Sequence, residues 1–302
     1  MAYSKVSVVI PAYNHERFIG PAVESVLGQT HADLELIIID DGSTDKTAEV
    51  IRSYQDKRLH YVYQENQDAY NALNRGLALA TGDFVAILNS DDIYTDNRLQ
   101  RLLDEQRATG AHCLFSRVQL INDDGDQLHD PALWWNQWYE DAVGRYLNSG
   151  DLYTAFLQRN ILVTTSNFFL TRAAVQTVGG FCSLRYLHDY DYIFRLLLAF
   201  PDQVRFLHEE SLLFYRIHGS NTISEAAIIG REQDKGVIRK YLLARMPENV
   251  QALAEAGIDR LVELEQELMQ EHRRREDAVL PGIRTQAKNL LRSCAKRLLG
   301  RA

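Results

Sequence analysis

Two adjacent acidic residues, Asp91 and Asp92, lie just after the apolar run 84–88. An apolar run of this length is typical of a buried strand, so both carboxylates are expected at a strand end. Neighbouring carboxylates repel each other unless a cation or hydrogen-bond donors neutralise them. Mg²⁺ and Mn²⁺ accept such oxygen ligands, and Mg²⁺ often bridges them to substrate phosphates. The alternative is a solvated turn or a helix cap, since aspartate is common in turns.

A second acidic pair, Asp40 and Asp41, follows the apolar run 34–39 and precedes a Gly-Ser-Thr turn. The hydroxyl residues of that turn suit a helix N-cap, and Asp41 also suits hydrogen bonds from a nucleoside base or ribose. In a parallel sheet, ligands bind beyond the carboxyl ends of the strands. The two acidic strand ends are therefore expected to face one crevice.

Two further positions carry groups with catalytic potential. Asp189 and Asp191 precede the apolar run 193–198. They either stabilise a helix N-terminus or place one carboxylate in the crevice as a general base. His218 is either a packed histidine or a metal ligand.

Strand-like and helix-like runs alternate four times in the first half of the chain. The runs of strand character are short and largely apolar, and the segments between them carry apolar residues at helical spacing. Strands are expected at 6–10, 34–39, 59–63 and 84–88. This alternation predicts a mostly parallel, Rossmann-like α/β sheet covered by helices on both faces. The last helix of this half is expected to begin near Thr95.

The second half of the chain is less regular. Residues 131–150 hold all three tryptophans and show no clear period, and the chain is helical in pattern from about 225 onward. The remaining expectations are a hairpin over 113–130 with its turn at 123–125, strands over 161–170 and 212–218, and a helix over 189–199.

Composition excludes several classes of protein. The chain has 302 residues, of which 46% are hydrophobic, and a net charge of −8, which argues against a general nucleic-acid binder. Three scattered cysteines fit free thiols in a reducing compartment. No apolar run approaches the roughly 18–20 residues that span a bilayer, and the first residues form no signal peptide. We therefore expect a cytoplasmic protein.

Taken in order, the motifs resemble those of family 2 glycosyltransferases, over about residues 4–222. A single motif of this kind is weakly informative, whereas the ordered series is specific. The resemblance implies a GT-A fold and inverting transfer of a sugar from a nucleotide-sugar donor, with Mg²⁺ or Mn²⁺. The matching segments are 6–14, Gln29-Thr30, 40–45, 80–83, Asn89-Ser90-Asp91-Asp92, Gly179-Gly180-Phe181 and Asp189-Tyr190-Asp191.

The resemblance also implies roles for individual residues on the donor side. Pro11, Tyr13 and Asp41 are expected to hold the nucleoside. Asp91 and Asp92 match the D-x-D region of the family, in which the second aspartate, here Asp92, usually ligates the metal on the donor diphosphate.

Three further residues take roles from the same resemblance. Asp189 matches the catalytic base of the family, and His218 matches a histidine expected near the diphosphate or the metal. Asn74 is expected to contact the donor, although Leu73 replaces a common arginine before it. His188 replaces the glutamate usual before the base, which predicts an altered pKa for Asp189.

Two other departures from the family pattern affect the donor side. Asn89 stands where many members have aspartate, which predicts a different metal affinity or metal preference. Asp68 stands where a glycine is common. None of the departures removes the expected chemistry.

The acceptor side is predicted from aromatic residues between the metal motif and the base. Trp134, Trp135, Trp138 and Tyr139 suit a platform that stacks on a sugar, with Trp135 as the acceptor contact. A packed core under the second half is the alternative. The acceptor is expected to be a saccharide or a lipid-linked saccharide, as in many relatives.

The domain organisation follows from the same patterns. Residues 1–224 are predicted to form the catalytic domain, with a nucleotide-sugar-binding half (1–110) and an acceptor half (111–224). Residues 225–302 are predicted to form a helical extension.

The last 22 residues, 281–302, hold six basic residues and no acidic one around an apolar stripe. This pattern predicts either a helix on the membrane surface or one packed on its own domain or a partner subunit. The segment 250–278 is a candidate for homodimerisation.

Two rival functions remain open. A sugar-nucleotide nucleotidyltransferase has a related fold, but it normally carries a glycine-rich, basic loop where this chain has residues 11–15. A non-catalytic nucleotide-sugar-binding scaffold is the other. The dinucleotide fingerprint and the P-loop motif are absent from the sequence. The leading prediction is an inverting glycosyltransferase of polysaccharide, O-antigen or glycolipid assembly.

Overall fold

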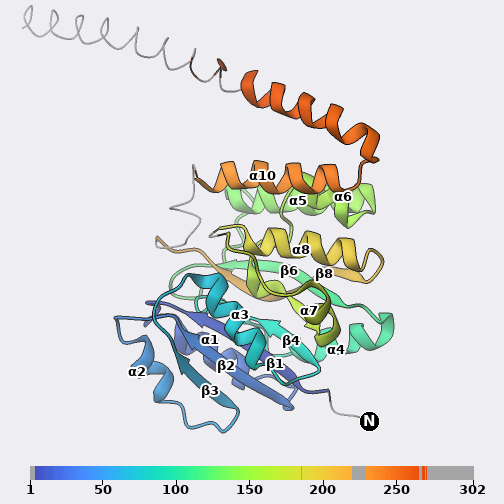
Figure 1. The fold of residues 1–302 in the computed structure, drawn as a ribbon. Helices are drawn as coiled ribbons and strands as arrows, with labels where there is room; N and C mark the ends of the chain where they lie inside the picture. The colour runs from blue at the N-terminus through green and yellow to red at the C-terminus, as the bar shows by residue number, and fades with distance from the viewer. Residues whose placement is uncertain (1–3, 185, 220–228, 265–266, 269, 271–302) are drawn as a thin grey trace, which may run out of the picture. The chain divides into compact units, whose positions relative to one another are not determined.

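The computed structural model describes residues 4–184, 186–219, 229–264, 267, 268 and 270. Its described part contains an eight-stranded mixed sheet with the order β3-β2-β1-β4-β7-β6-β8-β5 (Figure 1). The strands are β1 Val6–Ala12, β2 Leu34–Asp40, β3 Leu59–Tyr63, β4 Phe84–Ile87, β5 Ile93–Tyr94, β6 Cys113–Ile121, β7 Phe169–Thr171 and β8 Val204–Arg216.

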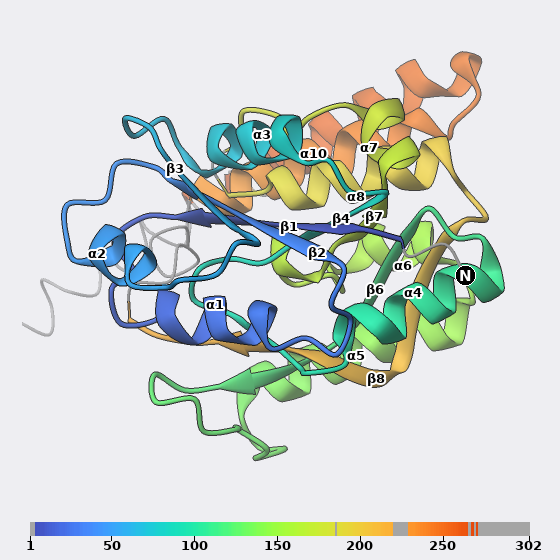
Figure 2. The ribbon, with the colours of Figure 1, turned by 90° about the horizontal axis from the view of Figure 1, so that it is seen from below.

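Helices cover the sheet on both sides. They are α1 Ile19–Leu27, α2 Thr47–Arg52, α3 Ala69–Leu79, α4 Arg98–Thr109, α5 Trp134–Ser149, α6 Leu152–Gln158, α7 Arg172–Val178, α8 His188–Ala199 and α10 Ile229–Ala244, with a 3₁₀ turn, η1, at Thr165–Asn167. Figure 2 shows α3 and α7 on one face and α1 and α4 on the other. The prediction of a mostly parallel α/β sheet with flanking helices is confirmed.

Strands β1 to β4 form the parallel half of the sheet. Val6 pairs with Leu34 and with Phe84, and Leu36 pairs with Leu59. Every residue of β2 is buried, as its near-continuous apolar sequence requires of a central parallel strand. The carboxyl ends of these strands meet at one edge, where the acidic pairs follow them.

Glu35 is a buried charge at the other end of these strands. Its carboxylate accepts hydrogen bonds from Lys5 Nζ at 2.6 Å, Ser7 Oγ at 2.5 Å and the Thr81 amide at 2.7 Å. Burial opposes ionisation, but these donors outweigh it and lower the pKa of Glu35 to about 2. The group therefore joins β1, β2 and the turn before β4 through charge-assisted hydrogen bonds.

The second half departs from the predicted elements. Of the hairpin expected over 113–130, the turn at 123–125 forms and Ile121 pairs with Gln127 at one antiparallel bridge. The rest of β6 pairs with β7 and β8 instead. The helix expected to begin near Thr95 begins at Arg98, because the Thr95 amide still donates to the Leu212 carbonyl of β8, at 3.2 Å. Of the strand expected over 161–170, only the end forms β7.

The chain divides into two compact units, 1–238 and 239–302, while the domain boundaries drawn from the sequence stay a prediction. Within the second unit, Arg239 makes ion pairs with Glu255 and Asp259 of a helix over 248–264. Segment 281–302, with its predicted membrane helix, lies outside the described residues. No helix in the described chain has the length and apolar character needed to cross a membrane.

Candidate active site

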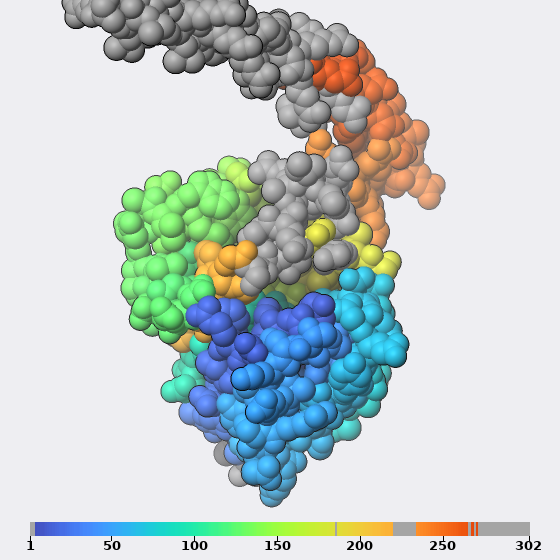
Figure 3. Space-filling model, turned by 90° about the vertical axis from the view of Figure 1, so that its left-hand side faces the viewer, coloured from blue at the N-terminus to red at the C-terminus, as the bar shows by residue number. Residues whose placement is uncertain are grey.

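A cavity of about 580 Å³ lies at the carboxyl ends of β1, β2 and β4. It is where the polar clusters after these strands were predicted to meet. Figure 3 shows a side of the molecule on which the N-terminal residues, in blue, lie beside green and orange segments of the second half. The predicted site residues that line the cavity are Pro11, Tyr13, Asp41, Asp91 and Asp189.

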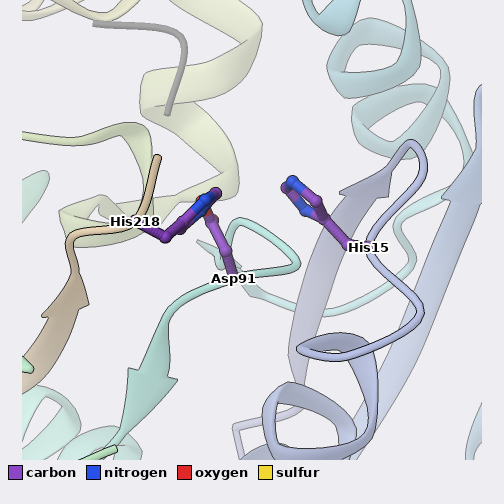
Figure 4. A group of neighbouring side chains, drawn as sticks. All are labelled: His15, Asp91 and His218. Carbon is purple, nitrogen blue, oxygen red and sulfur yellow. The ribbon is translucent and has the colours of Figure 1, made fainter. Parts of the chain in front are cut away.

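Beside the cavity, His15, Asp91 and His218 form a candidate metal centre (Figure 4). Their ligand atoms all lie within 4.8 Å of one another, and His218 Nε2 is 3.0 Å from Asp91 Oδ2. The three residues follow β1, β4 and β8. Two imidazoles and a carboxylate suit Mn²⁺ and other first-row metals, and the carboxylate also suits Mg²⁺. The donor set therefore fits the divalent cation that the family implies.

The pKa shifts in this cluster favour the protonation states that bind a cation. Burial alone would raise the pKa of Asp91, but the His218 hydrogen bond and the nearby imidazoles lower it below its ordinary value. Burial lowers the pKa of His15, whose Nδ1 lies 2.7 Å from Ser90 Oγ. At neutral pH these shifts favour an ionised Asp91 and an uncharged His15, the forms that bind metals.

Asp92 lies in a different environment from its neighbour. It is fully buried, and its Oδ2 accepts hydrogen bonds from Ser166 Oγ at 2.5 Å and Thr164 Oγ1 at 3.2 Å. Its Oδ1 accepts from the Arg216 amide at 3.0 Å. Burial, together with the charge of Asp91, raises the pKa of Asp92 to about 8. The structure thus ties Asp92 to two segments, the one around Thr164–Ser166 and the end of β8, and its role as a metal ligand stays a prediction.

The predicted nucleoside contacts lie together on one side of the cavity. Asp41 is buried, and its Oδ1 accepts hydrogen bonds from Gln64 Nε2 at 2.6 Å and from the Gln67 amide at 3.0 Å. Burial raises the pKa of this carboxyl group. Tyr13 is 47% exposed, so its ring is available for stacking on a planar base.

Asp189 lies in the first turn of α8 and lines the same cavity. Its Oδ1 accepts from the Tyr190 amide at 2.8 Å, and Asn160 Nδ2 lies 3.5 Å from its Oδ2. Burial raises the pKa of Asp189 above its ordinary value. His188 beside it is held by Thr165 Oγ1 and the Leu184 carbonyl. A buried carboxylate with a raised pKa has the properties of a general base.

Four predicted site residues are not part of the cavity lining: Asp92 and His218, described above, and Asn74 and Trp135. The Asn74 side chain donates to the Phe181 carbonyl at 2.9 Å and accepts from the Phe181 amide at 2.7 Å. Trp135 stacks on Tyr139 and, at 5.9 Å between centroids, on Tyr215, which does line the cavity. Asn74 thus links α3 to the Gly-Gly-Phe segment. Trp135 contacts the cavity only indirectly, by packing against Tyr215.

Sequence reasoning missed several features of the site. His15 was noted only as part of a loop, and its partners became visible only in three dimensions. Asn14, Asp68 and Val163 line the cavity and have φ values of 52°, 72° and 72°, which non-glycine residues rarely adopt. For Asp68 the sequence did indicate an unusual backbone conformation, because the residue occupies a position where the family often has glycine. Such strain at a cavity is typical of functional sites.

Comparison with known proteins identifies a sequence family. The profile described as Glycosyl transferase family 2 matches residues 7–176. An uncharacterized glycosyltransferase of Nostoc is 30% identical over 233 residues, covering 76% of this chain and 70% of that protein. TuaG of Bacillus subtilis, named for teichuronic acid biosynthesis, is 39% identical over 145 residues, covering 46% of this chain and 56% of that protein.

Solved structures share the fold at low sequence identity. Staphylococcus aureus TarS (residues 1–349) in complex with UDP-GlcNAc superposes with a TM-score of 0.62 at 18% identity, over 82% of this chain and 69% of that one. The mannosyltransferase PcManGT of Pyrobaculum calidifontis, in complex with GDP-Man and Mn²⁺, gives 0.58 at 17% identity, over 84% and 68%. These likenesses establish a GT-A-like architecture.

Proposed function

This chain belongs to glycosyl transferase family 2, and on that basis we propose that it transfers a sugar from a nucleoside-diphosphate sugar to an acceptor hydroxyl with inversion. The observation that carries the proposal is the meeting of three groups in or beside one cavity. These are the buried Asp41 on the nucleoside side, the Asp91 cluster, and Asp189 with its raised pKa.

The donor would bind with its nucleoside between Pro11, Tyr13 and Asp41, and its diphosphate at the candidate metal centre. Carboxylates at 41, 68, 91 and 189 line the cavity, so a bound diphosphate needs positive charge close by. His15, Asp91 and His218 would hold Mg²⁺ or Mn²⁺ there. When bound, that ion neutralises the charge that develops on the leaving diphosphate.

In this scheme Asp91 supplies the carboxylate ligand. Asp92, which the family resemblance suggested for that role, fixes the loop through its three buried hydrogen bonds.

Asp189 would act as the base. It accepts the proton of the acceptor hydroxyl while the hydroxyl oxygen bonds to the anomeric carbon and the bond to the donor phosphate breaks. The products are a glycoside and a nucleoside diphosphate. The base must lie across the sugar from the leaving group, and the position of Asp189 on α8 is compatible with this requirement. Its raised pKa makes the ionised carboxylate a stronger proton acceptor than an ordinary aspartate.

For the acceptor we propose a saccharide or a lipid-linked saccharide in polysaccharide, O-antigen or glycolipid assembly. The name of TuaG supports the polysaccharide part. Trp135 and Tyr215 would form the acceptor wall. Contact of 281–302 with the cytoplasmic membrane surface, and pairing with a second copy of the chain, rest on the sequence pattern alone.

Calorimetry with UDP, GDP, dTDP and CDP, each with and without Mn²⁺, tests the donor site. We expect metal-dependent binding of one of them. Incubation with the corresponding sugar nucleotides should then release the nucleoside diphosphate. Release of pyrophosphate would instead support a nucleotidyltransferase. Binding without turnover, together with full biological function of Asp189→Asn, would support the scaffold alternative.

A further inference from the structure

Arg216, the last residue of β8, is a buried arginine 2% exposed to solvent. Its guanidinium donates to three backbone carbonyls: Nε to Asp91 at 2.8 Å, and Nη1 to Asn122 at 2.6 Å and Asp123 at 2.8 Å. Burial lowers its pKa, as expected for a cation taken out of water. Such a group is tolerated when its donors are satisfied, and these bonds join β8 to two loops.

The position of Arg216 in the chain places it between the elements of the candidate metal centre. It precedes His218 by two residues and bonds directly to the backbone of Asp91. Its own amide donates to Asp92 at 3.0 Å. The loop that carries the carboxylate and the strand end that carries the imidazole are therefore joined twice, once through the guanidinium and once through Asp92.

Phe18 provides the surface on which this arrangement packs. The Arg216 guanidinium lies 5.0 Å from the centre of the Phe18 ring, and the His218 ring lies 4.7 Å from it. The His15 ring meets the edge of the same ring at 5.9 Å. One buried aromatic side chain thus contacts both imidazoles and the arginine that holds the carboxylate loop.

We infer that Arg216, packed on Phe18, is a positioning residue that holds Asp91 and His218 at the spacing of cation ligands. The inference rests on the proposed metal site. A planar guanidinium can donate hydrogen bonds to two loops at once, whereas the ammonium group of a lysine, on a flexible side chain, cannot match this fixed arrangement of donors. Loss of groups that orient metal ligands commonly lowers metal affinity by about 10- to 100-fold.

Arg17 offers a matched control. Its guanidinium also lies over Phe18, at 5.3 Å, and it pairs with the Asp123 side chain at 3.3 Å. Its side chain is 62% exposed, and within the described part of the chain its guanidinium bonds to Asp123 rather than to Asp91. Replacing it removes a cation from the same ring and the same turn while the Arg216 bonds stay in place.

The test measures Mn²⁺ alone binding to the full chain, by the loss of the free-ion EPR signal. We expect Arg216→Lys to bind Mn²⁺ about 10- to 100-fold more weakly, and Arg17→Gln to stay within about twofold of wild type. In turnover, the Mn²⁺ concentration for half-maximal rate should rise for Arg216→Lys while the rate at saturating Mn²⁺ changes less. A merely structural role would not move the metal requirement in this way.

Three results would overturn the inference. Unchanged Mn²⁺ affinity in a folded Arg216→Lys protein removes the positioning role and leaves the proposed function intact. If Arg216→Lys does not fold, Phe18→Leu takes its place, and unchanged affinity in that variant has the same meaning. Wild-type protein that binds no Mn²⁺ removes the proposed metal site and the inference with it.

Discussion

Substitutions at the two adjacent aspartates should have different effects: those at Asp92 should mainly lower stability, and those at Asp91 should mainly lower Mn²⁺ affinity. In Asp92→Ala the Arg216 amide loses its acceptor, which costs about 1–3 kcal/mol for a buried group. The Ser166 and Thr164 hydroxyls can turn to each other, since they already lie 3.2 Å apart, so their loss is smaller. With the cavity left by the carboxyl group, we expect about 3 kcal/mol of destabilisation.

Asp92→Asn should be much milder. The pKa of about 8 implies that Asp92 is mostly protonated at pH 7, and a protonated acid, like an amide, offers one acceptor and donor capacity. We therefore expect a loss of about 1 kcal/mol or less in urea unfolding, and Mn²⁺ affinity within a few-fold of wild type.

Asp91→Asn should show the reverse pattern. It removes the carboxylate that His218 contacts at 3.0 Å, so Mn²⁺ affinity should fall at least about 100-fold, while stability changes by less than about 1 kcal/mol. If a stable Asp92→Asn protein instead loses Mn²⁺ as completely as Asp91→Asn does, Asp92 is the ligand and the assignment to Asp91 is wrong.

The remaining predictions concern the base, one buried charge and one close packing contact. Asp189→Asn should lower the transfer rate by about 10³-fold and leave nucleotide binding unchanged, and a normal rate would remove Asp189 as the base. Because only the ionised base accepts a proton, the wild-type rate should rise with pH through the raised pKa of Asp189, and the residual rate of the variant should lack that rise. The folded pKa of Glu35 is about 2, below its ordinary 4.5, so wild type should lose stability as pH falls from about 5 toward 2. At pH 3.5 the loss of unfolding free energy should be about 1 kcal/mol smaller in Glu35→Gln than in wild type, a value already reduced because solvent screens the Lys5 charge. Equal losses in the two proteins as pH falls would contradict the assignment. A Cβ at Gly76 would clash with Val9 Cγ1, so Gly76→Ala should lower the free energy of unfolding by about 1–3 kcal/mol in thermal unfolding. Gly144→Ala, on an open helix face, should be neutral or stabilising, and equal effects at both glycines would refute the packing argument.

The parallel half of the fold was predictable because each of its strands is a short, largely apolar run. Asp41 and Asp91 could be placed at the crevice, since each lies within three residues of the end of such a run and parallel strands end at one edge. Their partners were not predictable in the same way. His15 joins Asp91 only through the pairing of β1 with β4, and a histidine in a polar loop carries no pattern of its own.

Errors in the second half arose from contacts between distant segments. Strand β5 has two residues, and it exists because β8, more than 100 residues later, pairs with it. The 113–130 hairpin is limited to one bridge beside its turn, because β6 pairs with β7 and β8 on its two edges. Helix α5 gave no clear period, since its aromatic residues point both to the core and to solvent: Tyr139 is buried, whereas Trp134 is 71% exposed.

The connections that build the candidate metal centre also bear on how the chain folds during synthesis. Strands β1 and β2 pair residues 28 positions apart, whereas Asp91 meets His218 across 127 positions and Asp92 meets Arg216 across 124. Closing so long a loop costs more chain entropy, and such contacts form slowly. A nascent chain that ends before residue 216 already contains the proposed nucleoside contacts Pro11, Tyr13 and Asp41, but the candidate metal centre still lacks His218. Cation-dependent donor binding, as proposed above, would therefore begin only after the chain has been made to residue 218.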